Sequence, residues 1–306
     1  MNRRVMFAGF LAVVACSDGS QISVATGMSH VLLTDDPFPY SRVARVDLYL
    51  VSVSGSLSAD TSATAGGDFI TLAAPHRLIN VLALQNGITD ELGAVTLPTG
   101  GITAVRLVID TDSSSITLKD GRKLTGSTTP GIHWQSSAGR PTLNAIIYDQ
   151  IVAHDTGATI VLDYDVGRAF ITPQEIDPNS TDSGFVFSPV FRAADVAHTG
   201  AITGSVRAHS AGGATVVDAS LRLYVGVVGT PENTWFSIAT AKTDSTGAFR
   251  FSYAATSSFW ARTGVSGRTY IVAVDPPGGS GLGRTLVQSV HVTAGIVTSI
   301  GTIVLP

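Results

Sequence analysis

Apolar and polar residues alternate along this chain in short stretches. Within residues 158–166, Ile160 and Leu162 fall on one side of the alternation, and Asp163 and Asp165 fall on the other. A period of two residues is typical of a β-strand that is buried on one face only. Similar runs end at Gly, Pro, Asp or Ser, and they occupy residues 45–55, 102–110, 185–192, 220–229, 247–253 and 269–276.

Helical periodicity is almost missing from the sequence. Residues 76–87 (HRLINVLALQNG) are the best candidate, and they suit a short helix or one more strand. The chain has 32 glycines and only 14% charged residues, a composition that favours strands and turns over helices. We therefore expect an all-β protein made of two antiparallel β-sandwich domains, either Greek-key and immunoglobulin-like or prealbumin-like.

The boundary between these domains is predicted near residue 197. A new strand-like segment begins at Gly200, after the strand that ends at Arg192. We expect a first domain over residues 28–196 and a second over residues 197–306. No repeat of 20 to 50 residues is apparent, so the two domains are different modules rather than an array.

The N-terminus has the pattern of an export signal. Arg3 and Arg4 precede an apolar run that ends at Ala15, and small polar residues follow Cys16. The run is about half as long as a helix that crosses about 30 Å of hydrocarbon. It therefore predicts a cleaved signal peptide over residues 1–15 rather than a membrane span.

The end of this signal, Val13-Val14-Ala15-Cys16, resembles the bacterial lipobox. The resemblance implies that Cys16, the only cysteine, carries diacylglyceryl and N-acyl lipid as the first mature residue, with residues 16–27 as a tether. An ordinary signal peptide with a coincidental cysteine is the alternative. The expected location is a bacterial membrane, at the outer membrane and cell surface or on a periplasmic face, and the choice of membrane stays open.

Charge and motifs exclude several function classes. A net charge of -4 gives no basic stripe, so a nucleic-acid partner is not expected. The seven histidines form no zinc-binding pair on one helix, and the sequence has neither a nucleophile elbow nor a phosphate-binding loop. We expect no enzymatic activity and no cofactor other than the lipid.

One acidic loop could hold calcium. Asp177, Asn179 and Asp182 supply oxygen ligands within residues 177–184. The loop lacks the glycine and glutamate of an EF-hand, so an ordinary solvated loop is the favoured interpretation.

Two further acidic pairs are candidate contacts for a ligand or metal. Asp163 and Asp165 lie about 7 Å apart on one strand face, where they could bind a metal or pair with Arg106 or Arg168. Structural pairing is favoured. The other pair, Asp35 and Asp36, is predicted to form the turn that starts a strand, although at a loop tip it could contact a partner.

The three tryptophans lie near polar, turn-like sequence. Trp134, Trp235 and Trp260 are therefore candidates for stacking against a glycan. The favoured alternative is that they cover the ends of their sandwiches.

Several segments in order resemble the bacterial domain-of-unknown-function 4382 family. The first, residues 32–54, begins Leu-Leu-Thr-Asp-Asp-Pro, and the others span residues 79–87, 97–110, 162–166 and 187–192. The resemblance covers roughly residues 28–195. Asp36 stands where the family usually has alanine, and Asn80 where it usually has aspartate. The resemblance implies an exported lipoprotein domain with no established activity.

The second domain is similar to the carboxypeptidase regulatory-like and Cna-B-like sandwich. Its Thr-Asp-x-x-Gly-x-Phe stretch carries Asp244, Gly247 and Phe249, which the resemblance places in a hairpin turn. Such modules usually act as spacers or stalks. The isopeptide bond of some relatives is not expected, because the only lysine here is Lys242, beside the turn.

These observations predict a non-catalytic, envelope-anchored lipoprotein that acts as a recognition or structural module. Its expected partners are the membrane, through the lipid, and a glycan or an envelope protein. The alternative is a hydrolase or metal-dependent enzyme whose residues are dispersed along the chain. The sequence leaves the oligomeric state open.

Overall fold

Short strands make up most of the chain, which confirms the prediction of an all-β protein. The computed structural model describes residues 24–35, 41–57, 69–134, 139–147, 151–256 and 269–306. None of the helices in these ranges has the length and apolar character needed to cross a membrane.

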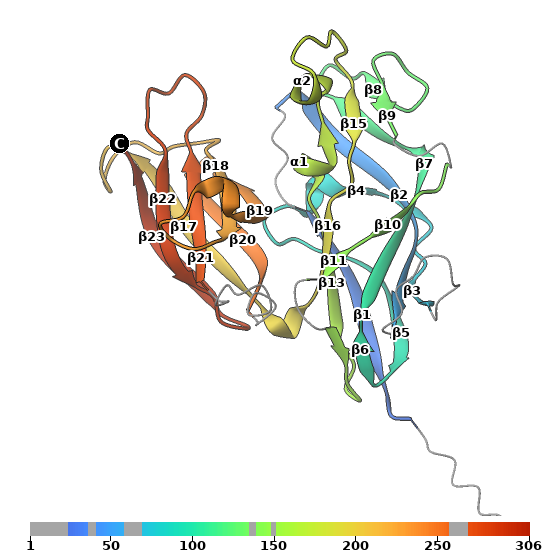
Figure 1. Ribbon diagram of the computed structural model, residues 1–306. Helices are drawn as coiled ribbons and strands as arrows, with labels where there is room; N and C mark the ends of the chain where they lie inside the picture. The colour runs from blue at the N-terminus through green and yellow to red at the C-terminus, as the bar shows by residue number, and fades with distance from the viewer. Residues whose placement is uncertain (1–23, 36–40, 58–68, 135–138, 148–150, 257–268) are drawn as a thin grey trace, which may run out of the picture.

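The first sixteen strands form a unit that we call the N-terminal sandwich (Figure 1). One sheet has the order β11-β16-β13-β1-β5, and another has the order β10-β7-β2-β3, with β4 on β2 and β8 on β7. Two small sheets, β12-β6 and β14-β15-β9, complete it. The strands are β1 (Thr26–Asp35), β2 (Val43–Ser56), β3 (Phe69–Ala73), β4 (Arg77–Asn80), β5 (Asp90–Pro98), β6 (Gly100–Ile102), β7 (Ala104–Leu118), β8 (Lys123–Leu124), β9 (Ile132–His133), β10 (Thr142–Asn144), β11 (Ile146–Ile147), β12 (Ile151–Ala153), β13 (Thr159–Tyr164), β14 (Phe170–Ile171), β15 (Phe185–Phe187) and β16 (Phe191–Asp195).

The remaining strands form the C-terminal sandwich (Figure 1). Its sheets have the orders β20-β17-β23 and β19-β18-β21-β22. The strands are β17 (Thr199–Ala208), β18 (Ser220–Val225), β19 (Phe236–Lys242), β20 (Ala248–Ala255), β21 (Thr269–Asp275), β22 (Thr285–His291) and β23 (Val297–Leu305).

Each sandwich has its own hydrophobic core. The first core includes Val31 from β1, Leu50 from β2 and Leu107 from β7. The second includes Ile202 from β17 and Phe251 from β20. Burying these side chains away from water is the main force that holds each pair of sheets together.

Most strand pairs are antiparallel, but both sandwiches also contain parallel pairs. In the N-terminal sandwich β1 pairs with β13, with Leu33 opposite Leu162. In the C-terminal sandwich β17 pairs with β23, with Val206 opposite Ile303. In both cases the first strand of the sandwich therefore lies beside one that is distant in sequence.

Helices are short, as the sequence analysis expects. The segment over residues 76–87 combines both of its predicted possibilities, because β4 leads directly into a 3-10 turn and then into the positive-φ residues Asn86 and Gly87. The helical segments are η1 (Val81–Leu84), α1 (Val166–Ala169), α2 (Pro173–Ile176), η2 (Val196–His198) and η3 (Glu232–Thr234).

The strand β13 differs from its expected half-buried form. Five of its six residues are buried, including Val161 and Asp163 on the side predicted to face water. Ile238 and Tyr253 of the C-terminal sandwich lie against that side, around a small cavity that Val161 and Asp163 also line. The two faces of β13 therefore differ as the sequence predicts. The face that carries Asp163, however, is covered by the C-terminal sandwich and not by water.

The hairpin between β19 and β20 has the predicted turn geometry. The Asp244 carboxylate accepts hydrogen bonds from the backbone N–H of Thr246 at 2.8 Å and of Ala248 at 3.0 Å. Gly247 has a φ of 75°, and Phe249 is buried in the core. Aspartate, glycine and phenylalanine therefore take the places that the sequence assigns to them.

Replacing Asp244 by alanine is expected to lower the free energy of unfolding by about 1 kcal/mol, because the turn loses these acceptors. Asp244→Asn, which keeps an acceptor oxygen, is the matched control. Hydrogen bonds, chiefly from the Thr246 hydroxyl, lower the pKa of Asp244. A lowered pKa means that this stabilisation is complete above the ordinary aspartate pKa and is lost as the pH falls through the lowered one. Urea unfolding at neutral and acidic pH measures both effects, and equal losses for the two variants would contradict the assignment.

Candidate functional site

A groove of about 680 Å³ lies between the two sandwiches. Its lining residues belong to β18 and β19 of the C-terminal sandwich and to α1 and the segments before β16 of the N-terminal one, and Figure 1 shows where these elements lie. Its volume lies within the range of about 300–1,000 Å³ that is typical of ligand sites, which often occur between domains. The residues that line it are Asp165, Gly167, Arg168, Ile171, Glu175, Ser188 and Val190 from the N-terminal sandwich, and Ser220, Leu221, Arg222, Tyr224, Ser237, Thr240, Ala241 and Lys242 from the C-terminal one.

Strand alternation sets the chemistry of the wall formed by the C-terminal sandwich. Leu221 and Leu223 of β18 point into the core, which leaves Ser220 and Arg222 on the outer face of the sheet. Ser220 is opposite Lys242 of β19, and Arg222 is opposite Thr240 in the same pair of strands. Hydroxyl and cationic side chains therefore share one face.

Tyr224 and Trp235 form an aromatic support at one end of this wall. Their ring centroids are 5.8 Å apart in an edge-to-face arrangement, and the Trp235 indole donates a hydrogen bond to the Thr230 hydroxyl at 3.0 Å. A side chain at Gly226 would collide with this indole, because an added Cβ would lie 2.3 Å from its ring. Trp235, a candidate for sugar stacking, is not among the residues that line the groove, and its ring packs against Tyr224 instead.

Charges beside this wall are largely paired. Arg284 forms ion pairs with Glu232, at 2.5 Å for one nitrogen–oxygen pair, and with Asp275 at 2.7 Å. The hydrogen bonds from Arg284 lower the pKa of Glu232. Arg222 donates to the Tyr224 hydroxyl at 3.5 Å, and this contact is the main cause of its raised pKa.

Two carboxylates on the opposite wall have structural roles. Asp165 caps α1 by accepting the backbone N–H of Arg168 at 3.0 Å, and it lies 3.8 Å from the Arg168 side chain. Glu175 accepts from both the backbone N–H and the hydroxyl of Thr172, in a capping box that starts α2. The predicted pairing of Asp165 with Arg168 is confirmed.

Asp163, the other member of this acidic pair, is also buried. Asp163 forms an ion pair with Arg192 of β16 and not with Arg106, whose guanidinium stacks on Phe69. Arg192 also donates to the Ile238 carbonyl of the C-terminal sandwich. These contacts join the two sandwiches through one guanidinium.

Asp35 ends β1 instead of starting a strand, and it is only 3% exposed. Its carboxylate accepts the backbone N–H of Val166 at 3.1 Å. The predicted place of Asp35 in a turn that starts a strand is therefore wrong, and so is the alternative of an exposed loop tip, because the parallel strand β13 and the start of α1 cover this residue. Asp36 lies outside the described residues.

Tyr164 lies beside these carboxylates. Burial raises the pKa of its hydroxyl well above the ordinary value, and the nearby charges of Asp35 and Asp165 raise it further. Its hydroxyl oxygen is buried and has no hydrogen-bond partner among the residues that the structure describes. The side chain is therefore held as a neutral phenol.

Tyr164→Phe is expected to raise the free energy of unfolding by about 1 kcal/mol, because the change removes a buried polar group that makes no hydrogen bond. The control is Tyr270→Phe, since the Tyr270 hydroxyl donates to the Ala255 carbonyl and its removal should destabilise. Thermal or urea unfolding would separate the two signs. A loss of stability in both variants would show that Tyr164 has a polar partner.

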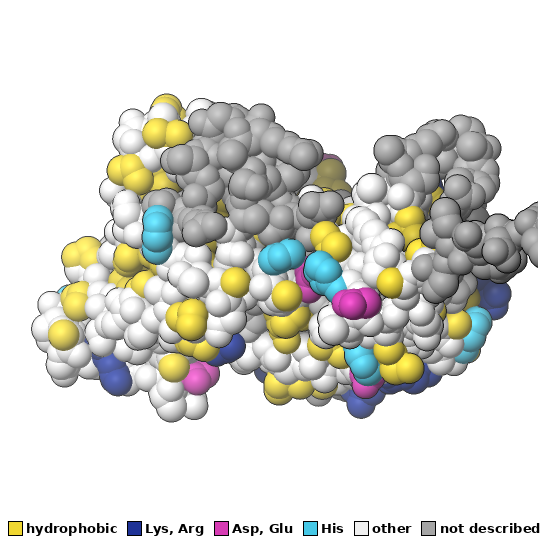
Figure 2. All heavy atoms as spheres, turned by 90° about the horizontal axis from the view of Figure 1, so that it is seen from below, with side chains coloured by type: hydrophobic (Ala, Val, Ile, Leu, Met, Phe, Trp, Pro, Cys, Tyr) yellow, Lys and Arg dark blue, Asp and Glu magenta, His cyan; other side chains and the backbone are white. Residues whose placement is uncertain are grey.

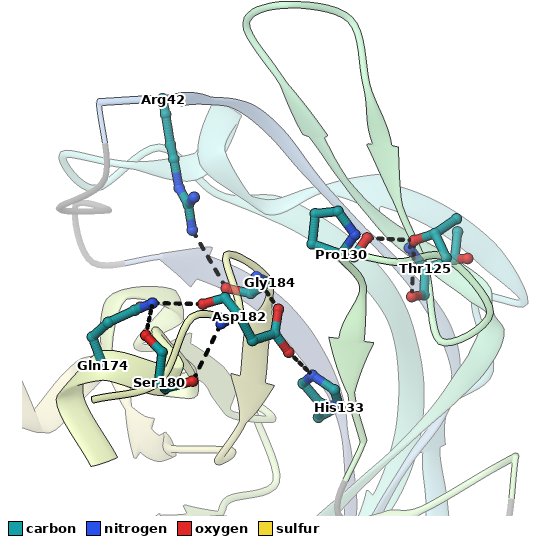
Figure 3. Close-up of polar contacts among 9 residues, drawn as sticks. Arg42, Thr125, Pro130, His133, Gln174, Ser180, Asp182 and Gly184 are labelled. Carbon is teal, nitrogen blue, oxygen red and sulfur yellow. Dashed lines mark hydrogen bonds and ion pairs between the residues drawn. The ribbon is translucent and has the colours of Figure 1, made fainter. Parts of the chain in front are cut away.

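The acidic loop considered as a calcium site is stabilised by hydrogen bonds of its own side chains. Asp182 accepts the backbone N–H of Gly184 at 2.8 Å, and its other oxygen contacts the His133 ring at 2.5 Å (Figure 3). The Gly184 contact is the main cause of the lowered pKa of Asp182, with His133 second. Asp177 accepts from the backbone N–H of Asn179 at 3.0 Å. The candidate ligands thus take part in turn contacts rather than converging on one point.

Trp134 packs within the N-terminal sandwich. Its ring lies 4.7 Å from Phe187 and 5.9 Å from Phe170, in edge-on contacts. This placement favours the structural interpretation of Trp134 over the sugar-stacking one. Trp260 and the lipidation residue Cys16 lie outside the described residues.

Histidines and carboxylates do not assemble a metal centre in the described part of the chain. No group of three or more His, Cys, Asp or Glu side chains there could hold an ion. Figure 2 shows one face of the molecule, on which several His side chains lie next to an Asp or Glu side chain. The pair His30 and Glu91, at 2.7 Å, is an exposed contact between β1 and β5.

A comparison with family models shows which protein family the N-terminal sandwich belongs to. The model described as "Domain of unknown function (DUF4382)" matches residues 26–189, more than half of the chain. The chain belongs to the DUF4382 family. The resemblance predicted from five sequence segments is thereby confirmed. In this DUF4382 protein Asn80, which replaces the family's usual aspartate, keeps a buried side-chain oxygen without a partner among the described residues.

Comparisons of the whole DUF4382 chain give distant similarities. No curated protein matches it. The minor pilin GBS52 of Streptococcus agalactiae is 10% identical, with 90% of this chain and 95% of that chain covered and a TM-score of 0.21. The shaft pilin SpaA of Lactobacillus rhamnosus GG is 11% identical, with 92% and 97% covered and a TM-score of 0.22. The Bacillus anthracis TIE protein is 7% identical, with a TM-score of 0.26, and the 91% of this chain that aligns spans only 34% of that protein.

Apart from Asp165, the sequence analysis did not identify the residues of the groove as a site. Arg222 occupies a polar position of an alternating strand, a place that solvent-exposed residues commonly take. Only the packing of a second sandwich opposite this face makes it the wall of a groove. The sequence offered one signal for this wall, namely Arg222 between the core residues Leu221 and Leu223. Such a position alone is weak evidence for a binding site.

Proposed function

We propose that this DUF4382 protein is a non-catalytic recognition module of the bacterial envelope, anchored through lipid on Cys16, and that it binds its partner in the groove between the sandwiches. The observation that carries the proposal is the groove itself, which has side chains from both sandwiches on its walls. Its carboxylates, Asp165 and Glu175, are occupied in helix caps, and its described lining contains no histidine. This lining supports binding better than acid–base chemistry.

The C-terminal sandwich serves in this proposal as one wall of the groove, and its sequence resemblance to carboxypeptidase regulatory-like and Cna-B-like modules suits a spacer of this kind. The lipobox-like sequence that ends at Cys16 supports the proposed membrane anchor. Lipid chains there would hold the protein at the membrane, since each buried methylene contributes about 0.8 kcal/mol.

Affinity capture from the native envelope tests the proposal. The wild-type chain is compared with Ser220→Trp, which fills the groove, and with Thr96→Trp, which adds the same bulk at an exposed position of the edge strand β5. We expect the captured partner to be lost only with Ser220→Trp. The same captured set with all three chains would overturn the groove as the binding site.

Membrane fractionation tests the anchor separately. Cys16→Ser should move the protein from the membrane to the soluble fraction, because the thioether to the lipid cannot form. If the substituted protein stays with the membrane after a high-salt wash, lipid on Cys16 is not what holds it there.

A further inference from the structure

The groove walls combine cationic and hydroxyl side chains from both sandwiches. Arg222 and Lys242 come from adjacent strands of one sheet, and Arg168 comes from α1 on the other wall. Arg168 also reaches across, because its guanidinium donates to the Ser237 carbonyl at 3.4 Å. Cations from three separate elements thus line one space.

Their charges remain accessible to a ligand. Arg168 and Arg222 are exposed, and the contact of Arg222 with the Tyr224 hydroxyl leaves further N–H donors of its guanidinium available. Lys242 pairs with Asp218 at 3.0 Å, and the two side chains are 24% and 68% exposed. Because Asp218 is mostly in solvent, the pair is weak, and a bound carboxylate can replace Asp218 at little cost.

The lining is mixed rather than strongly basic. Asp165 and Glu175 offset two of the three cations, and beside them Arg284 is outnumbered by its two acidic partners, Glu232 and Asp275. A polyanion would gain little from such a balance, because its affinity depends on many uncompensated cations. A ligand with one isolated negative group fits the balance better.

The uncharged part of the lining indicates what carries that group. Hydroxyl groups lie on both walls, one on the N-terminal sandwich and three on the C-terminal one, and they are interspersed with aliphatic side chains and one tyrosine. Such a surface can satisfy many ligand hydroxyls, whereas a peptide partner is usually anchored by large apolar side chains in deep pockets. The hydroxyl residues are Ser188, Ser220, Ser237 and Thr240.

We infer that the groove binds an acidic saccharide, a hydroxyl-rich chain that carries isolated carboxylate or sulfate groups, with Arg222 and Lys242 binding the anion and Arg168 contacting it from the other wall. This inference rests on the proposed function and gives its ligand a chemical class. Arginine is suited to the anion because its planar guanidinium can donate two parallel hydrogen bonds to one carboxylate. The serines and Thr240 bind the sugar hydroxyls.

Calorimetric titration of the full chain carrying Cys16→Ser tests the inference. The probes are tetragalacturonate, its neutral methyl ester, and a sulfated oligosaccharide, at about 0.15 M salt, where exposed charges are screened beyond roughly 8 Å. We expect one of the two acids to bind at least about tenfold more tightly than the ester. The stronger of the two identifies carboxylate or sulfate as the natural group.

Arg222→Gln should weaken binding of the preferred acid about tenfold, since the substitution removes a charge-assisted bidentate contact. The control is Arg122→Gln on the β7–β8 hairpin, where Arg122 pairs only with its neighbour Asp120 among the described contacts. This control should bind as the wild type does. Circular dichroism of both variants verifies that they fold.

Three results would overturn the inference: equal affinity for the acid and its ester, no binding of either acid, or equal effects of Arg222→Gln and Arg122→Gln. The proposed function fails separately. If Ser220→Trp abolishes envelope capture while neither acid binds, the groove is a recognition site for another ligand class. If Ser220→Trp changes neither capture nor saccharide binding, both are wrong.

Discussion

We expect Arg192→Met to lower the free energy of unfolding by about 3–5 kcal/mol, because the substitution leaves the Asp163 carboxylate buried without its ion-pair partner. The Arg192 and Asp163 side chains are 8% and 6% exposed, so water cannot take the place of the missing guanidinium. The same change removes the hydrogen bond to the Ile238 carbonyl, and with it a direct link to the C-terminal sandwich. Urea unfolding measures the loss.

The matched control is Arg122→Gln, whose partner Asp120 is exposed. Surface ion pairs of this kind contribute about 0–1 kcal/mol, so a small effect is expected. The double variant Asp163→Leu with Arg192→Met should recover much of the stability, since an apolar pair needs no compensation. A single-variant loss no larger than that of Arg122→Gln would contradict the assignment of a buried pair.

Phe251→Ala is expected to cost about 3–5 kcal/mol, and to act first on the C-terminal sandwich. Phe251 is 1% exposed and packs edge-on to Phe249, with 5.9 Å between ring centroids, in a core separate from that of the N-terminal sandwich. Truncation leaves a cavity that the surrounding β-sheets can only partly close.

Fluorescence of single-tryptophan variants localises this effect. Trp134 reports on the N-terminal sandwich and Trp235 on the C-terminal one, and the unfolding midpoint seen by Trp235 should fall further. Phe236→Ala, at a side chain 60% exposed, is the control and should change stability by no more than about 0.5 kcal/mol. Equal midpoints for both reporters in Phe251→Ala would mean that the two sandwiches unfold as one cooperative unit.

Local patterns in the sequence predicted the strands and turns well. Asp244, Gly247 and Phe249 each take their expected place, because a hairpin depends on contacts between residues only a few positions apart. The pairing of Asp165 with Arg168 is local as well, since the two residues are three positions apart.

The errors concern contacts between distant parts of the chain. Asp163 was assigned to a solvent-facing side, yet Arg192 and the second sandwich cover it. Asp35 was expected in the turn that starts a strand, yet it ends one and is buried beside a strand about 130 residues further on. Periodicity shows that one face of a strand differs from the other, but what covers each face depends on tertiary packing.

The groove could not be predicted for the same reason. Its walls come from segments around residues 165–190 and 220–242, and neither segment alone carries a ligand-binding motif. The relative placement of the sandwiches creates the site, and contacts such as that of Arg168 with Ser237 fix it.

The parallel pairing of first and late strands has a consequence for how the chain reaches its native state. Strand β1 can pair along both of its edges only after β13 has been synthesised. Strand β17 depends in the same way on β23, whose last residue is Leu305. Such long-range closure makes folding slow, since loop-closure entropy is lost before the native contacts form. Each sandwich is therefore expected to stay incomplete until its late strand has emerged, so a chain arrested before residue 297 would keep the β17 edge open to aggregation.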